Sequence, residues 1–397
     1  MGQLRISSVR GKEVYAFSFD SQWLDEQPHP LLLDPALRWG RGEQFSGEGF
    51  GTFLDSAPDR WGRTLIARRE AMEARMAGRP PRHLMDSDFL LAVEDQTRMG
   101  GLRFRDPETG NFLSNHPQQQ IPPLRLLREL ESASRLVDAE APDDASMDAG
   151  LRILLWPGSS LGGARPKANT LDPEGRLWMA KFPRRSDEVD VGAWEGLTQA
   201  LAKQAGLRVP ESRVEKFSNH GHTFLVRRFD RQGDRRLHYA SAMTLLGYRD
   251  GDGAAQGAGY LDLAELICRC GENVDEDLRE LWSRMVFSVA VRNADDHLRN
   301  HGFLLGERGW RLSPLFDVNP QAGATSLSLN ITENENQIDI ELVREVAPYF
   351  RLDQSSADSI LRRILDVVSG WQALACRYAC SAADIDRMRI AFQCENG

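Results

Sequence analysis

The sequence predicts an α+β fold with two lobes, a mixed α/β N-terminal part and an all-helical C-terminal lobe. The first observation is order: most strand patterns lie before residue 239, and helical spacing dominates after it. Strands followed by helices are typical of an α+β chain. The second observation is a polar stretch at 292–303, where an acid and an amide follow an apolar helix. Together they predict a two-lobed layout like that of protein kinases.

The polar stretch holds Asp295, and Asn300 follows five positions later. Protein kinases place a catalytic Asp and a metal-holding Asn at this offset, so Asp295 and Asn300 are candidates for those two roles. Asp317 comes after the short apolar run 310–312, which reads as a strand, where a second metal ligand is expected. The alternative is an ordinary polar loop, because Asp and Asn favour turns and helix caps.

A glycine turn with two bases precedes a predicted strand. Glycines let backbone N–H groups approach an anion, and an Arg or Lys neutralises its charge. The turn matches no standard phosphate-binding fingerprint, so a flexible surface turn is the alternative. Its residues are Gly162, Gly163, Ala164, Arg165, Pro166 and Lys167.

Lys181 lies in the apolar strand 175–183, and Glu195 lies in the following helix, predicted at 189–205. A lysine in such a strand is costly unless its charge is used, for example on nucleotide phosphates. A strand Lys followed by a helix Glu is the order of the kinase ion pair. A snorkelling lysine and an exposed glutamate are the alternatives.

His297 and His301 lie four positions apart beside acids, which raises the alternative of a zinc site. No third ligand of a known pattern accompanies them. We therefore expect His297 to orient the Asp295 loop through hydrogen bonds.

Bulk properties narrow the function classes. The net charge of −9 disfavours non-specific binding to nucleic acid. The apolar runs are short and interrupted, and the N-terminus lacks a signal-peptide pattern, so we expect no membrane segment. The five cysteines form no C-x-x-C pair, which fits a reducing cytoplasm.

Three domains are predicted: an α+β unit at 1–147, an ATP-binding region at 148–237 and a helical lobe at 238–397. Within the first, we expect a hairpin at 4–19 and a helix that is capped by Asp55 or Ser56 and runs to Met76. Further expectations there are a short helix at 86–93, a strand pair at 100–105 and 111–113, a helix at 124–137 and a linker at 141–148. The second region should hold the strand pair 212–217 and 223–229.

Five motifs in order resemble the HipA family, the serine/threonine kinase toxins of bacterial toxin–antitoxin modules. They are residues 159–167, 180–183, 225–231, 293–303 and 311–320, and the stretch 53–69 also resembles the family's N-terminal unit. The ordered set is far more specific than any single motif.

This resemblance implies roles for the candidate residues. Asp295 would be the catalytic base, and Asn300 and Asp317 would hold Mg²⁺. The side chain of Lys181, the loop 162–167 and His297 would contact ATP. The hinge beside the adenine would comprise Arg227, Arg228 and Phe229.

The resemblance also implies regulation and partners. A serine before the glycine loop, Ser160 or the adjacent Ser159, would be autophosphorylated and so silence the kinase. The substrate would be a translation protein such as an aminoacyl-tRNA synthetase. A HipB-like helix-turn-helix antitoxin would bind the chain, and DNA would be reached only through it.

Two other classes remain open. A small-molecule phosphotransferase of kinase-like fold would share the Asp…Asn loop and the later Asp. A non-catalytic ATP-binding protein would lack part of this set, and the intact Asp295, Asn300 and Asp317 argue against it.

Overall fold

The computed structural model describes residues 1–114, 121–138, 150, 154 and 164–393. The chain forms two compact units. The first comprises Met1–Pro173 and Asp230–Tyr248, and the second comprises Glu174–Phe229 and Arg249–Gly397. Both are discontinuous in sequence, so neither coincides with one of the three expected domains, whose boundaries stay a prediction.

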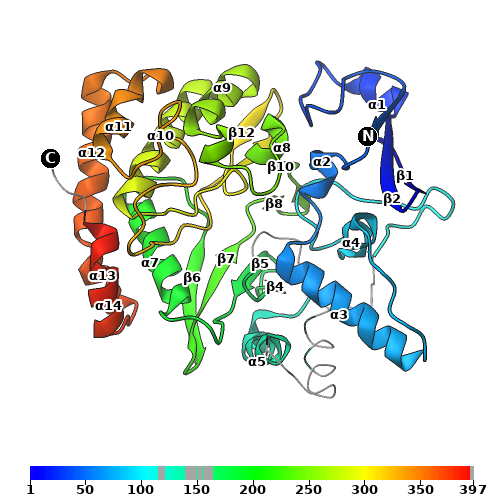
Figure 1. Ribbon diagram of the computed structural model, residues 1–397, viewed down its shortest axis with the longest axis horizontal. Coiled ribbons are helices and arrows are strands. Elements are labelled where there is room, and N and C mark those ends of the chain that lie inside the picture. The colour runs from blue at the N-terminus through cyan, green and yellow to red at the C-terminus, as the bar shows by residue number, and fades with distance from the viewer. Residues whose placement is uncertain (115–120, 139–149, 151–153, 155–163, 394–397) are drawn as a thin grey trace. The chain divides into compact units, whose positions relative to one another are not determined.

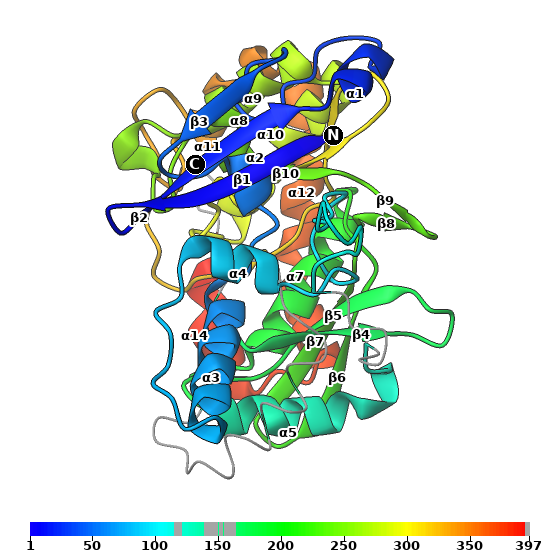
Figure 2. The ribbon, with the colours of Figure 1, turned by 90° about the vertical axis from the view of Figure 1, so that its right-hand side faces the viewer.

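The first unit opens with an antiparallel sheet of order β1-β2-β3 (Figure 2). Its strands are β1 (Gly2–Val9), β2 (Lys12–Phe19) and β3 (Glu43–Ser46). The predicted hairpin is confirmed: Arg10 and Gly11 turn the chain with φ of 52° and 76°, the left-handed values that a two-residue hairpin turn requires. Tyr15, Phe17 and Phe19 alternate along β2 and are all buried.

The remaining elements of the first unit are mostly short. They are α1 (Ser21–Glu26), α2 (Gly51–Leu54), α3 (Arg60–Met76), α4 (Asp86–Ala92), η1 (Leu124–Leu126), α5 (Leu127–Val137), β4 (Lys167–Leu171), β8 (Arg231–Gln232), β9 (Arg235–Arg236), β10 (Tyr239–Ser241) and α8 (Ala242–Leu246). The helices expected at 86–93 and 124–137 are confirmed. The expected linker at 141–148 lies outside the described residues.

Two local expectations are wrong in detail. The long helix is capped by Asp59, whose Oδ1 accepts from Gly62 N at 2.7 Å, and not by Asp55 or Ser56. Asp55 cannot cap it because its carboxylate accepts from the backbone N and the Oγ of Ser241 at 2.7 and 2.8 Å. The strand pair expected at 100–105 and 111–113 is reduced to one bridge, between Arg105 and Phe112.

The second unit places a helix against a sheet. In the sheet, β5 (Leu177–Lys181) pairs antiparallel with β7 (Gly221–Arg227), and β7 pairs with β6 (Ser212–Ser218). The packed helix is α7 (Val191–Gln204). These elements confirm the predicted strand, helix and strand pair.

The rest of the second unit is mainly helical (Figure 1). Its elements are η2 (Ala254–Gln256), α9 (Tyr260–Cys270), α10 (Val274–Ala290), β11 (Gly302–Leu305), β12 (Trp310–Leu312), α11 (Ile340–Glu345), η3 (Ala347–Phe350), α12 (Gln354–Ser369), α13 (Trp371–Arg377), α14 (Ala382–Met388) and η4 (Arg389–Phe392). Helix α10 is its core, since nearly every residue after its first turn is buried. The β11–β12 hairpin interrupts a lobe that was expected to be all-helical. Among the described residues, no helix has the length and apolarity needed to span a membrane.

Helix α7 is packed closely on two sides. A Cβ built on Gly192 would lie 2.0 Å from the backbone oxygen of His222, so the helix approaches β7 at a distance that only glycine permits. On another side, Trp194 contacts the rings of Trp371 and Phe392, each at 6.0 Å between centroids. The position of α7 is therefore fixed by contacts along its length.

Replacing Gly192 by Ala should destabilise the protein. Alanine favours a helix interior by about 1 kcal/mol, but an overpacked site costs roughly 1–3 kcal/mol, and a backbone oxygen cannot rotate away. We expect the melting temperature to fall by about 2–4 °C. Gly47→Ala is the control, because a Cβ there meets nothing within 4 Å. Equal melting temperatures for the two variants would contradict the close packing of α7.

Candidate functional site

Lys181 ends strand β5 and is buried between two carboxylates. Its Nζ lies 2.5 Å from Glu195 Oε1 and 2.7 Å from Asp317 Oδ1. The contact expected from the order of strand Lys and helix Glu is therefore present. Burial alone would lower the pKa of Lys181, but Asp317 and Glu195 outweigh it and raise that pKa above its ordinary value. The ammonium thus stays charged and joins α7 to the segment after β12.

Asp317 lies in the segment that follows β12, as expected, and its backbone is unusual. Its φ of 58° falls in the left-handed region, which Asp tolerates better than most residues. Such conformations persist where the surroundings fix the chain, and they are common at functional sites.

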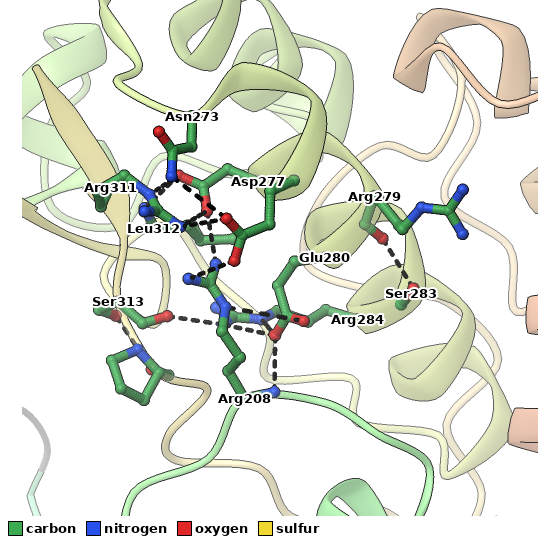
Figure 3. Close-up of polar contacts among 12 residues, drawn as sticks. Arg208, Asn273, Asp277, Arg279, Glu280, Ser283, Arg284, Arg311, Leu312 and Ser313 are labelled. Carbon is green, nitrogen blue, oxygen red and sulfur yellow. Dashed lines mark hydrogen bonds and ion pairs between the residues drawn. The ribbon is translucent and has the colours of Figure 1, made fainter.

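An ionic cluster on α10 fixes the chain before Asp317 (Figure 3). Buried Asp277 accepts from the backbone N of Leu312 and from Nε of Arg311, both at 3.0 Å. It also accepts from Nη2 of Arg208 at 2.6 Å. One carboxylate therefore binds both the backbone and a side chain of β12.

The next turn of α10 continues this support. Arg284 donates from Nη2 to the backbone oxygen of Ser313 at 2.6 Å, and its Nε donates to Glu280 at 2.9 Å. The backbone N of Leu315 donates to the oxygen of Arg208 at 2.7 Å. Asp317 thus follows a stretch whose polar groups are bound to α10 and to the loop after α7.

Asp295 lies in the loop between α10 and β11, and its side chain is exposed. Its backbone oxygen accepts from Nδ2 of Asn300 at 2.9 Å, so the predicted acid and amide are in contact. In the described part of the chain, no hydrogen bond or ion pair reaches the Asp295 carboxylate. Partial desolvation raises the pKa of Asp295; His297 opposes the rise, and the charges of Asp317 and Asp296 add to it.

The two histidines of the loop differ. The backbone N of His297 donates to the oxygen of Asp295 at 3.0 Å, but its ring Nδ1 is buried without a partner among the described residues. The expected orienting contact of His297 thus comes from its backbone. His301 is fully buried, and its Nε2 lies 3.0 Å from Asp296 Oδ1. Within the described ranges, no group of three or more His, Cys, Asp or Glu could hold a metal ion, which disfavours the zinc alternative.

The predicted phosphate loop is only partly described. Ser159, Ser160, Gly162 and Gly163 lie outside the described residues. Ala164 and Arg165 are half-buried, and Pro166 is buried.

Lys167 opens β4, where its Nζ lies 2.6 Å from Asp59 Oδ2. Trp61 Nε1 donates to the backbone oxygen of Lys167 at 3.0 Å. The lysine is 2% exposed and ion-paired, unlike an open phosphate ligand, so that role stays a prediction.

The predicted hinge residues lie at and just after the end of β7. Arg227 pairs with Glu211 at 3.2 Å, and buried Arg228 donates its backbone N to the oxygen of Leu177 at 2.9 Å. The Phe229 ring lies 5.4 Å from that of Phe316, and both are half-buried. Phe316 was not predicted; its only signal is its place directly before Asp317. The two rings thus contact each other at the position directly before Asp317.

The donor set fits Mg²⁺, which prefers oxygen ligands and usually keeps waters. Asp317 supplies a half-buried carboxylate. Asn300 has its nitrogen bound to Asp295, which leaves its amide oxygen for a cation. The Oδ1 of nearby Asn319 is buried without a partner in the described residues.

Replacing Lys181 by Met should destabilise the fold, because Glu195 is 2% exposed and would keep a buried charge without its ammonium. Breaking a buried pair from one side costs about 3–5 kcal/mol, whereas removing both charges is often close to neutral. We therefore expect Lys181→Met/Glu195→Met to recover most of the loss in urea denaturation. The surface pair Arg387–Glu188 is the control, and its loss should cost less than about 1 kcal/mol. A stable single variant would show that the buried pair carries little energy.

The chain matches known proteins in both sequence and structure. A family model described as HipA-like C-terminal domain matches residues 159–371, more than half of the chain. "Putative kinase Y4mE" of Sinorhizobium fredii is 28% identical over 231 residues, which cover 51% of this chain and 50% of that protein. A "Putative kinase" of Haemophilus influenzae is 28% identical over 134 residues, 31% of this chain and 39% of that protein. The chain thus spans half or less of the length of these curated relatives.

A solved structure matches nearly the whole chain. It is the Shewanella oneidensis MR-1 toxin–antitoxin complex of HipA, HipB and operator DNA, matched with a TM-score of 0.67 and 16% identity over 98% of this chain and 92% of that one. At this identity the match shows the fold, which is HipA-like. Together with the family match, it shows that this chain belongs to the HipA family.

Proposed function

We propose that this chain is an ATP-dependent serine/threonine protein kinase of HipA type. The observation that supports it best is the placement of Lys181 between Glu195 and Asp317. The exposed Asp295 lies close enough to Asp317 for the charge of Asp317 to raise the pKa of Asp295. A lysine, a helix glutamate, a metal-holding acid and a base are the parts that kinases use.

The chemistry follows from these positions. The acceptor hydroxyl attacks the γ-phosphorus of ATP, its proton passes to Asp295, and ADP leaves. Lys181 stays cationic and can attract the phosphates, while Phe229 and Phe316 can hold the base. Bound Mg²⁺, held by Asp317 and Asn300, would neutralise phosphate charge. The loop 162–167 and His297 remain further proposed contacts to the nucleotide.

The acceptor is proposed to be a serine or threonine of a translation protein, for example an aminoacyl-tRNA synthetase. The exposure of Asp295 supports a large acceptor, because a small molecule is usually bound in an enclosed pocket. A small-molecule phosphotransferase of the same fold is the second candidate.

We further propose that the chain is the toxin of a toxin–antitoxin pair and acts in the cytoplasm. The partner would be a HipB-like helix-turn-helix antitoxin. The supporting observation is the complex of HipA with HipB and operator DNA, whose HipA has the same fold. The net charge of −9 supports a division of labour in which the antitoxin supplies the DNA contacts.

Replacing Asp295 by Asn should abolish phosphoryl transfer and leave ATP affinity largely unchanged, because the base acts on the acceptor. Mass spectrometry after incubation with Mg-ATP measures the first, and calorimetry the second. In wild type we expect phosphate at Ser160 or Ser159, and none in Ser159→Ala/Ser160→Ala. Asp275→Asn is the control, since Asp275 pairs with Arg351 on the surface at 2.7 Å.

Three results would count against parts of the proposal. Wild-type phosphorylation by the Asp295 variant would exclude it as the base. Transfer to another protein without phosphate at either serine would exclude the autophosphorylation site alone. Transfer only to a small molecule would favour the second candidate.

DNA binding should require a partner. At moderate salt, a gel shift with this protein alone should show no specific band, because phosphate contacts need a basic surface and the chain is acidic. A co-expressed helix-turn-helix protein should produce a specific band, and the shifted complex should also contain this chain. A tight, sequence-specific shift by the chain alone would contradict this.

A further inference from the structure

Asp296 directly follows the proposed base Asp295. Its side chain is buried, whereas that of Asp295 is exposed. Asp296 is 2% exposed, and its carboxylate is reached by side chains from three places in the second unit. Tyr260, at the start of α9, donates its hydroxyl to Oδ2, and Ser288 of α10 donates from Oγ to the same oxygen at 3.0 Å. Nε2 of His301 lies 3.0 Å from Oδ1.

These contacts close the loop that carries the proposed base. Asp296 and His301 meet across it, and one residue earlier on each side Asn300 Nδ2 donates to the Asp295 oxygen at 2.9 Å. The two contacts therefore join consecutive residues on one side of the loop to consecutive residues on the other. Asp296 and His301 are both buried, and the pair Asp295 and Asn300 holds the groups proposed to do chemistry.

Ser288 extends the network to the segment of Asp317. Its backbone oxygen accepts from the backbone N of Asn293 at 2.8 Å, and its Oγ lies 3.5 Å from Asn293 Nδ2. Asn293 Oδ1 in turn accepts from the backbone N of Asn319 at 3.2 Å. The Asp295 loop and the Asp317 segment are thus bound to each other through buried polar groups.

A charge is kept at Asp296 although burial disfavours it. Burial by itself would raise the pKa of Asp296, but His301 and the hydrogen bonds from Tyr260 and Ser288 outweigh it and hold the pKa below its ordinary value. A buried carboxylate adds little net stability, and contacts from three separate places suit this one to holding one fixed geometry.

We propose that Asp296 is a positioning residue: its carboxylate, held by Tyr260, Ser288 and His301, fixes the 293–301 loop so that Asp295 and Asn300 keep their place beside the Asp317 segment. This inference rests on the proposed kinase function. Asp296 does not contact the substrate in this proposal. Tyr260 and Ser288 affect the position of the loop only by holding the Asp296 carboxylate.

The test compares three variants of the full chain. Asp296→Asn keeps the shape but removes the charge and two acceptor positions, so kcat should fall roughly 10–100-fold while ATP affinity, measured by calorimetry without Mg²⁺, changes less than about twofold. Tyr260→Phe removes one donor and should lower kcat less. The double variant should be no slower than Asp296→Asn, because both act through one carboxylate. Asp34→Asn is the matched control, a buried carboxylate in the first unit that accepts from Ala36 N at 2.8 Å.

Each outcome decides the proposal. Wild-type kcat in Asp296→Asn would overturn it, as would parallel losses of kcat and ATP affinity, or an additive double variant. A further outcome is that Asp34→Asn also loses kcat in proportion to a fall in its melting temperature. The losses of kcat in Asp34→Asn and Asp296→Asn would then both be assigned to lower stability alone.

Absence of any turnover in wild type would contradict the proposed function instead. Hydrogen exchange then tests the positioning: peptides covering 293–301 and 317–321 should exchange faster in Asp296→Asn and not in Asp34→Asn. Unchanged exchange would overturn the proposal independently of activity.

Discussion

The ammonium of Lys181 lies between Glu195 and Asp317, and a buried charge of this kind is stable only while its partners stay in place. Lys181 ends strand β5, Glu195 lies in helix α7, and Asp317 lies in a segment much later in the sequence. The ion pairs therefore make the positions of three distant segments depend on one another. Loss of Lys181 would leave the carboxylate of Glu195, which is 2% exposed, without its ammonium in a site with little water to solvate it.

Each partner of Lys181 lies on a supported element. Helix α7 approaches β7 so closely at Gly192 that no side chain fits there, and aromatic rings pack on another side. Asp317 follows a stretch whose backbone is bound by Asp277 and Arg284 of α10. The geometry at Lys181 is thus set by the packing of whole elements, and not by the three side chains alone.

Two adjacent acids have different environments in the loop after α10. Asp295 is exposed and its carboxylate is open to an acceptor, whereas Asp296 is buried among Tyr260, Ser288 and His301. Neighbouring residues in an irregular loop often point in opposite directions, so one can be held by the core while the other faces solvent. The exposed acid is the one proposed as the base, and the buried one is the one proposed to hold the loop.

The sequence alone determined the local elements and the order of the candidate groups. The β1–β2 hairpin, the strand of Lys181, helix α7 and the Asp295/Asn300 spacing follow from periodicity and short offsets, which backbone geometry controls. The tertiary structure alone decided that Lys167 pairs with Asp59, that Asp55 binds Ser241 instead of capping α3, that Phe316 packs on Phe229, and that Asp296 meets His301. Most of these contacts join residues that lie far apart along the chain, where no periodic pattern relates them. In the case of Asp296, the contact distinguishes it from the adjacent Asp295, which has the same side chain. Only the packing of distant segments determines which polar group meets which partner.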